Sequence, residues 1–118
     1  MKRDFTYIDD IVEGVVRVID QIPKSSVSQY STASSPYCIY NIGNNNPVTL
    51  RAFITAIESA CQVKANENVL PMQPGDVPLT FADIDPLKKT FNFTPKTPID
   101  KGIEKFVDWY RNIDLKRV

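Results

Sequence analysis

The sequence predicts an α/β fold in a single domain of 118 residues. Short runs of β-branched and aromatic residues alternate with longer stretches in which apolar residues recur three and four positions apart. A residue that can cap a helix stands directly before a proline at the head of the last two stretches. The expected order is strand, helix, loop, strand, helix, strand, turn and two helices, with no internal repeat.

The start of the chain is expected to form a strand followed by a helix. The run over 5–8 is typical of a short strand. Asp10 and Glu13 have the spacing of a capping box for a helix over about 11–21. Apolar positions in this helix cover more than one narrow stripe, so it is expected to pack on two sides or against a sheet.

A serine-rich stretch and an apolar run follow. Six serines lie between residues 25 and 35, which predicts a flexible surface loop over about 24–36. The nearly continuous apolar run over 37–42 is typical of a strand covered on both faces, and the polar turn after it is a candidate ligand edge. Two or three short strands cannot surround such a strand, so the chain is expected to oligomerise or to be part of a longer protein.

The second half of the chain contains several clear start and turn signals. Thr49 is expected to cap a helix over about 50–62. An extended run over 68–72 and a Pro-Gly turn over 73–76 are expected next. Asp85 with Pro86 is the start signal of a short helix, and Thr97 with Pro98 is the start signal of a last helix over about 98–111. The apolar side of this last helix is formed by Ile99, Ile103, Phe106, Val107 and Tyr110.

Composition excludes several classes of function. The 14 Lys and Arg balance 14 Asp and Glu, which argues against nonspecific binding to nucleic acid. Without histidine, Ser-His-Asp and Cys-His catalysis is excluded, and no metal site is expected. Cys38 and Cys61 are expected to be reduced core residues. No apolar run typical of a signal peptide or a membrane span is found, which predicts a cytoplasmic chain without a membrane partner.

Polar residues at strand ends and turns are the candidate binding groups. The sequence has no Gly-rich dinucleotide motif and no Tyr-x-x-x-Lys pair, so no catalytic residue is predicted. Arg3 could clamp a diphosphate through paired N–H donors, or only pair with Asp4 or Asp9. Gln73 and Asp76 flank the Pro-Gly turn and could bond phosphate or ribose oxygens, or Asp76 could only cap its own turn.

Three further groups each have two interpretations. The asparagines at 44–46 could contact a ligand beside the next helix N-terminus, which favours an anion, although turn geometry alone explains them. Asp9 and Asp10 could be a carboxylate pair for acid-base work or metal binding, but helix capping explains them better. Trp109 and Tyr110 could stack on a base or sugar, but their spacing favours Tyr110 in the core and Trp109 in the core or an interface.

Three motifs occur in order along the chain. They read Arg3-Asp4-Phe5-Thr6-Tyr7-Ile8-Asp9-Asp10, Tyr40-Asn41-Ile42-Gly43-Asn44-Asn45 and Leu70-Pro71-Met72-Gln73-Pro74-Gly75-Asp76-Val77-Pro78. Together with the stretch from Ala82 to Tyr110, they resemble the C-terminal part of UDP-glucuronate 4-epimerases, which are extended short-chain dehydrogenases acting on nucleotide sugars. The resemblance covers nearly the whole chain.

The resemblance implies that residues 1–118 are an incomplete C-terminal portion of a Rossmann-type nucleotide-sugar epimerase, with the last sheet strand and a small substrate-binding subdomain. It places Arg3 on the diphosphate of UDP, and Gln73 and Asp76 beside the diphosphate and ribose. In this family an N-terminal Rossmann half binds NAD and carries the Tyr-x-x-x-Lys pair. The parent enzyme would interconvert UDP-glucuronate and UDP-galacturonate, whereas this chain alone is expected to be inactive and to bind no cofactor.

The resemblance also implies partners and leaves alternatives. The expected partners are a UDP-sugar and the N-terminal Rossmann half, and exposed apolar surface could also drive homo-oligomers. Gln73 stands where many related epimerases have Arg, and Asn92 stands where relatives often have Gly. The alternatives are a fragment of a UDP-glucuronate decarboxylase or nucleotide-sugar dehydratase, which share this scaffold, and a stand-alone binding or interaction module.

Overall fold

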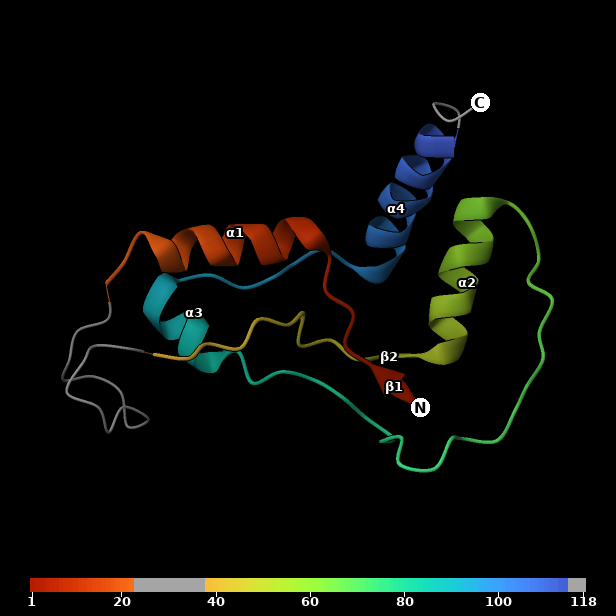
Figure 1. Cartoon of the computed structure of the whole chain (residues 1–118), viewed down its shortest axis with the longest axis horizontal. Helices are drawn as coiled ribbons and strands as arrows, with labels where there is room; N and C mark the ends of the chain where they lie inside the picture. The colour runs from red at the N-terminus through yellow and green to blue at the C-terminus, as the bar shows by residue number, and fades with distance from the viewer. Residues whose placement is uncertain (23–37, 115–118) are drawn as a thin grey trace.

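The computed structural model describes residues 1–22 and 38–114. The described elements are β1 (Lys2–Arg3), α1 (Ile8–Ile19), β2 (Val48–Thr49), α2 (Leu50–Cys61), α3 (Asp85–Phe91) and α4 (Ile99–Asp114). The molecule is elongated, 54 × 38 × 24 Å, with α1 beside α3 in one part and α2 beside α4 in the other (Figure 1). The flexible loop predicted over 24–36 lies outside the described residues.

The small sheet brings distant parts of the chain together at β1. β1 and β2 pair in antiparallel fashion, with Arg3 opposite Val48. Lys2 also forms a parallel bridge with Leu79, and its backbone N–H donates to the carbonyl of Pro78 at 2.8 Å. Segments from the beginning, the middle and the later part of the chain therefore meet around β1.

Helix α1 differs from its prediction at its N-terminal end. It begins at Ile8, so the strand expected over 5–8 is wrong. Tyr7 is the N-cap and makes no side-chain capping hydrogen bond. The capping box is wrong as well, because the carboxylate of Asp10 accepts a hydrogen bond from the backbone N–H of Thr97 instead, at 2.9 Å. A long-range partner has replaced the local one that the spacing favoured.

The local start signals of the next helices are largely confirmed. The hydroxyl of Thr49 accepts a hydrogen bond from the N–H of Ala52 at 3.1 Å and caps α2, as predicted. Proline stands in the first turn of α3, also as predicted, but Ile84 rather than Asp85 is the N-cap. Ile84 has no side-chain acceptor for capping, and the Oδ1 of Asp83 instead accepts a hydrogen bond from the N–H of Asp85 at 3.1 Å.

Helix α4 packs against α2 along only part of its apolar side. Val107 is buried, and Ile99 and Ile103 are half-buried. Tyr110 is 56% exposed, so its predicted place in the core is wrong, and Phe106 on the same side of the helix is 54% exposed. The periodicity correctly marks an apolar stripe, but α2 covers only one edge of it.

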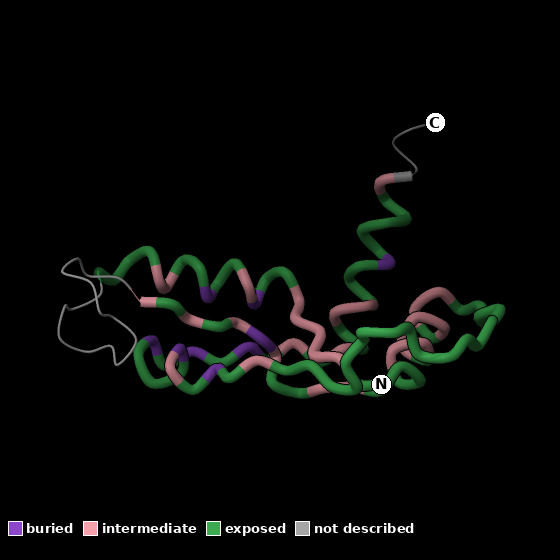
Figure 2. The backbone as a smooth tube through the Cα atoms, turned by 60° about the horizontal axis from the view of Figure 1, so that its bottom comes forward, coloured by how far each residue is buried: buried purple, intermediate pink, exposed green. Residues whose placement is uncertain are grey.

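The core lies between α1 and α3, where buried residues gather in Figure 2. Leu87 is fully buried beside Phe91 and Phe93, and half-buried side chains close the cluster from α1 and from the segment before β2. These half-buried residues are Val18, Tyr40 and Ile42. The edge of the Tyr40 ring meets the Phe91 ring with centroids 5.0 Å apart. Helix α1 approaches this core closely at Gly14, where a Cβ would lie 3.0 Å from Ile42.

Two further predicted strands are wrong. Residues 38–42, the described part of the run 37–42, form no strand, because no neighbouring strand among the described residues pairs with them. Tyr40 and Ile42 face the core, but Ile39 is 73% exposed, so the run is not covered on both faces. The run over 68–72 also forms no strand and is exposed throughout.

The cysteines and the Pro-Gly turn agree better with expectation. Cys38 and Cys61 are free, as predicted, although both are half-buried rather than in the core. The turn over 73–76 is confirmed, because Gly75 has a φ of 86° and the N–H of Asp76 donates to the carbonyl of Gln73 at 3.1 Å.

Candidate binding site around Arg3

The guanidinium of Arg3 is held by the segment that follows the Pro-Gly turn. Its Nη2 is hydrogen-bonded and ion-paired to the carboxylate of Asp76. Its Nη1 donates to the carbonyl of Val77 at 2.7 Å and to that of Lys2 at 3.0 Å. The fold thus brings together Arg3 and Asp76, two of the three residues predicted to bind a ligand, and fixes the plane of the guanidinium.

The acidic neighbours expected to neutralise Arg3 have other partners. The carboxylate of Asp4 accepts hydrogen bonds from the backbone N–H groups of Asn45 at 3.0 Å and Asn46 at 3.2 Å. Asp9 pairs with Lys105 at 3.2 Å. The simple pairing of Arg3 with Asp4 or Asp9 is therefore wrong. Asp9 is exposed whereas its neighbour Asp10 is buried, so the two do not form a shared carboxylate site.

The asparagine turn after residue 43 serves the fold. Asn45 has a φ of 53°, the left-handed geometry that this residue type tolerates. The side-chain amide of Asn44 donates to the carbonyl of Thr97 at 3.3 Å. Gly43 allows a close approach, because a Cβ there would lie 2.6 Å from the Cβ of Ala82. Sequence reasoning missed the part that Asp4 has in this turn, since its partners lie some forty positions away.

Asp76 has two roles at the turn. Its Oδ1 accepts the N–H of Val77 at 3.0 Å, which is the local capping expected by default, and it also binds Arg3. Gln73 stands at the other end of the same turn, joined to Asp76 by its carbonyl. The side chains of Arg3 and Asp76 are 23% and 34% exposed, so both can be reached by a ligand. Any anion that approaches Arg3 must share the cation with Asp76.

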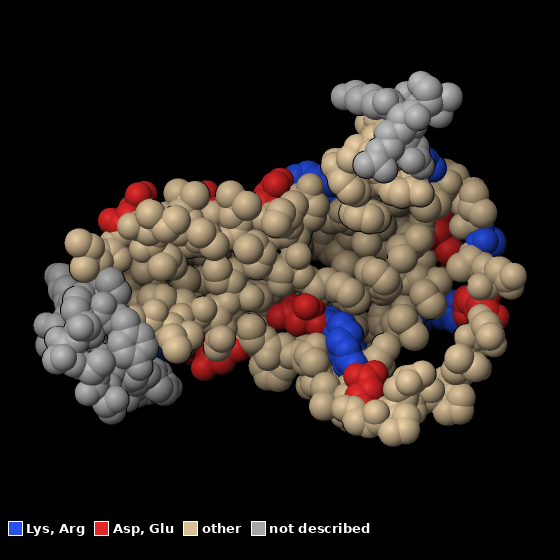
Figure 3. All heavy atoms as spheres, in the orientation of Figure 1, with Lys and Arg blue, Asp and Glu red and all other residues tan. Residues whose placement is uncertain are grey.

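The electrostatics of the site are local. On the face shown in Figure 3, described basic and acidic side chains are interspersed, and no broad area of one sign is drawn there. This agrees with the equal numbers of acidic and basic residues in the sequence. A charged ligand would therefore be recognised by a few placed groups, and not drawn in by a general surface field.

The described residues form neither a metal centre nor a membrane-spanning helix. Within 1–22 and 38–114, no group of three or more Cys, Asp or Glu side chains is placed to hold a metal ion. No helix in the same part of the chain has the length and apolar character needed to cross a membrane.

Comparison with known proteins bears directly on the resemblance of the three motifs. No protein-family model matches the chain. The chain is 48% identical over 118 residues to an uncharacterized 37.6 kDa protein of Escherichia coli O111:H-, covering 95% of this chain and 35% of that protein. It is 39% identical over 118 residues to a probable UDP-glucuronate 4-epimerase of Rhizobium meliloti, covering 93% of this chain and 34% of the relative.

The chain matches a C-terminal segment of UDP-glucuronate 4-epimerases. It spans about a third of the length of the curated relatives named above. The similarity includes the plant enzymes, since UDP-glucuronate 4-epimerase 1 of Arabidopsis thaliana is 41% identical over 112 residues, or 93% of this chain and 26% of the relative.

Solved structures share the fold of this chain. UDP-glucose 4-epimerase of Bifidobacterium longum, solved with NAD+ and UDP, superposes with a TM-score of 0.76 at 24% identity, covering 92% of this chain and 30% of that one. UDP-glucuronic acid 4-epimerase of Bacillus cereus, solved with UDP-glucuronic acid and NAD, superposes with a TM-score of 0.72 at 24% identity. The match covers 93% of this chain and 32% of that one. The predicted fold class, a part of a Rossmann-type nucleotide-sugar epimerase, is confirmed.

Proposed function

We propose that this chain is the UDP-binding side of an NAD-dependent epimerase that interconverts UDP-glucuronate and UDP-galacturonate. In this proposal the chain orients UDP, and an N-terminal Rossmann half holds NAD and performs the chemistry. The observation that carries the proposal is the guanidinium of Arg3, fixed at a tight turn by Asp76 and two backbone carbonyls. A fixed, partly exposed guanidinium is the group that best matches two diphosphate oxygens.

The charges at the turn suggest a division of work among the three residues. A phosphate repels the carboxylate of Asp76, so the diphosphate would lie on the guanidinium of Arg3. Asp76 would keep that guanidinium in place and accept a hydrogen bond from a ribose hydroxyl. Gln73 would donate from its neutral amide to a phosphate oxygen. Because the backbone already orients Arg3, little side-chain freedom would be lost on binding.

We infer that NAD is bound outside the described part of the chain. The junction of β2 with α2 contains no glycine, and the hydroxyl of Thr49 already accepts a hydrogen bond from the backbone N–H of Ala52 in the first turn of α2. The sequence has no Tyr-x-x-x-Lys pair to remove a proton from a sugar hydroxyl. We therefore place the NAD-binding and proton-transfer groups in the Rossmann half, and expect this chain alone to be inactive.

The apolar face of α1 supports a partner of that kind. Five apolar side chains on one side of the helix are 44% to 74% exposed, although the opposite side packs on the core. These residues, which we call the α1 face, are Ile8, Val12, Val15, Val16 and Ile19. Figure 2 shows exposed residues recurring along α1. We propose that the Rossmann half covers the α1 face, since the relatives are about three times as long as the chain.

An NMR titration of the full chain with UDP tests the proposed site. Saturable amide shifts are expected at Arg3, Gln73 and Asp76. Arg3→Ala is expected to weaken UDP binding by roughly tenfold or more, because charge-assisted hydrogen bonds are lost. Arg111→Ala removes an exposed arginine from α4 and should leave binding unchanged. Equal UDP affinity in the wild type and in Arg3→Ala would contradict the proposed site.

An activity assay tests the division of labour. The isolated chain, supplied with NAD and UDP-glucuronate, is expected to form no UDP-galacturonate. Formation of the product by purified chain would show that catalytic groups lie within these 118 residues. In the same assay, the products of UDP-glucuronate decarboxylation and of nucleotide-sugar dehydration can be monitored as well. Their formation would indicate one of the alternative reactions of this scaffold.

A further inference from the structure

A long exposed segment connects α2 to the Arg3 site. Every residue from Gln62 to Phe81 is exposed, and we call this segment the strap. In Figure 1 it forms the wide green to teal arc that leaves α2 and returns past β1. Figure 3 shows open space between part of this arc and the body of the molecule. The strap carries both Gln73 and Asp76, so its position determines where these two side chains lie.

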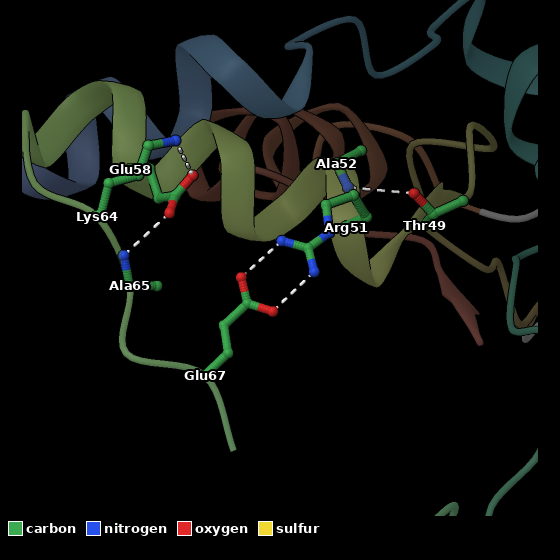
Figure 4. A network of polar contacts seen from close by, with 7 residues as sticks. All are labelled: Thr49, Arg51, Ala52, Glu58, Lys64, Ala65 and Glu67. Atoms are coloured by element: carbon green, nitrogen blue, oxygen red, sulfur yellow. Dashed lines mark hydrogen bonds and ion pairs between the residues drawn. The ribbon is translucent and has the colours of Figure 1, made fainter. Parts of the chain in front are cut away.

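The strap is attached to the body near each of its ends. At the far end Asp76 binds Arg3, and the backbone beyond it bonds to Lys2. Near α2, a cluster of polar contacts holds the strap against the helix (Figure 4). Between Glu67 and the turn, the large apolar side chains of Val69 and Leu70 are 84% and 66% exposed.

The attachment near α2, which we call the latch, consists of two ionic contacts and one backbone hydrogen bond. Arg51 donates from Nη1 and Nη2 to the two carboxylate oxygens of Glu67, at 2.6 and 2.7 Å. Glu58 accepts from the ammonium of Lys64 at 3.0 Å and from the backbone N–H of Ala65 at 2.9 Å. Figure 4 shows both contacts on the same side of α2. The paired geometry of the first contact fixes direction as well as distance.

The spacing of the latch aligns the strap with the helix. Arg51 lies in the first turn of α2, and Glu58 lies about 10 Å further along the helix axis, at a rise of about 1.5 Å per residue. The strap residues that meet them run in the opposite direction, from Lys64 at Glu58 back to Glu67 at Arg51. Three extended residues cover about 10 Å, so this part of the strap matches the helix in length.

We propose that the latch positions the strap for UDP binding, so that Arg51 and Glu67 act as positioning residues for Gln73 and Asp76. This inference rests on the proposed function. Without the pair of Arg51 and Glu67, the strap would be held by Glu58 only as far as Ala65 and would be free from Asn66 to the turn. Gln73 and Asp76 would then sample more positions, and UDP would have to order them when it binds.

Charge reversal with rescue tests the latch in the full chain. Arg51→Glu and Glu67→Arg are each expected to weaken UDP binding about three- to tenfold and to speed hydrogen exchange at hydrogen-bonded strap amides such as those of Ala65 and Asp76. The double variant restores an opposite pair and should recover both values. An acidic residue in the first turn of α2 is favoured by the helix dipole, so Arg51→Glu should remain folded.

A matched control removes an ion pair that does not touch the strap. Lys101 and Glu104 pair at 2.8 Å on the exposed side of α4, and the variants Lys101→Glu and Glu104→Lys make the same charge changes. Neither should alter UDP binding or exchange in the strap. Unchanged affinity and exchange in the latch variants, or a double variant that recovers neither, would overturn the inference.

The two readouts separate this inference from the proposed function. If the wild-type chain does not bind UDP, both the proposed site and the role of the latch in UDP binding are wrong. Hydrogen exchange in the latch variants would then still show whether the latch orders the strap. If UDP binds and Arg3→Ala abolishes binding while the latch variants bind normally, only the positioning role is wrong.

Discussion

The buried carboxylate of Asp10 accepts a hydrogen bond from the backbone N–H of Thr97 across 87 positions of sequence. Asp10 lies in the first turn of α1, and Thr97 lies in the segment that leads into α4. The bond therefore ties the two parts of the elongated molecule together. It also satisfies a part-buried backbone donor, the N–H of Thr97.

Replacing Asp10 is expected to destabilise the fold. Asp10→Ala leaves the N–H of Thr97 without its acceptor and should lower the free energy of unfolding by about 1–3 kcal/mol in a urea titration. Asp9→Ala is the matched control, because Asp9 is exposed and its pair with Lys105 should contribute less than about 1 kcal/mol. An equal decrease in the free energy of unfolding in the two variants would show that the hydrogen bond to Thr97 stabilises the fold no more than the exposed ion pair of Asp9.

Two glycine-to-alanine substitutions are expected to have opposite effects. At Gly43 an added Cβ would lie 2.6 Å from Ala82 and 2.8 Å from the carboxylate of Asp4, so Gly43→Ala should cost about 1–3 kcal/mol of stability. At Gly102, inside α4, the nearest contact would be an ordinary 3.4 Å to Tyr7, and the higher helix propensity of alanine should add about 0.5–1 kcal/mol. Thermal unfolding of both variants checks the two signs.

The core cluster is expected to depend on its one fully buried described side chain, Leu87. Leu87→Ala should lower the free energy of unfolding by about 2–5 kcal/mol, because it leaves a cavity between Phe91 and Phe93. Leu70→Ala makes the same change on the exposed strap and should stay within about 0.5 kcal/mol of the wild type. A small loss at Leu87 would mean that the cluster closes around the missing atoms.

Charges on the α1 face are expected to leave folding intact and to reduce association. Val12→Lys with Val16→Lys should keep the free energy of unfolding within about 0.5 kcal/mol, since both side chains are about half exposed. Any concentration-dependent sedimentation of the chain should decrease. Val18→Lys, on the side that packs against the core, should instead unfold the protein. A large loss of stability in the double variant would place the α1 face inside the fold.

The latch is expected to weaken in acid. The backbone N–H of Ala65, followed by the ammonium of Lys64, holds the pKa of Glu58 below its ordinary value of 4.5, and nearby Glu67 opposes this shift. Arg51, with a smaller effect from Lys64, likewise lowers the pKa of Glu67. Because both pKa values are depressed, the contacts are complete above pH 4.5 and are lost as the pH falls through the lower folded values.

NMR pH titration measures this loss directly. The amide shift of Ala65 should follow protonation of Glu58, with a midpoint below 4.5. Lys64→Met should move that midpoint upward but not fully to 4.5, because the N–H of Ala65 remains. A midpoint at or above 4.5 in the wild type would contradict the contacts seen at Glu58.

Local signals in the sequence predicted local structure well. Thr49 caps α2 and Gly75 forms the expected turn, because each needs only residues within a few positions. Asp10 shows where local reasoning stops, since a distant amide outcompetes the capping partner. Tyr110 shows a second limit, because periodicity identifies an apolar face but cannot tell whether another element covers it.

The candidate site was predictable in composition but not in geometry. The motif resemblance selected Arg3 and Asp76, and the fold places them in contact. Their contact could not be derived from spacing, because it depends on the bridge between Lys2 and Leu79. The latch gave no sequence signal at all, since Arg51 and Glu67 lie 16 positions apart in different kinds of segment. UDP binding by these residues stays a prediction.

The bridge at β1 also has a consequence for the order of folding. The guanidinium of Arg3 joins groups 73 and 74 positions further along the chain, whereas α2 and its cap need only neighbouring residues. Closing so long a loop costs chain entropy before any contact compensates for it, so such contacts form slowly. The helices should therefore form first and the Arg3 site last. In a refolding experiment, recovery of the Arg3 contacts would mark completion of the native topology.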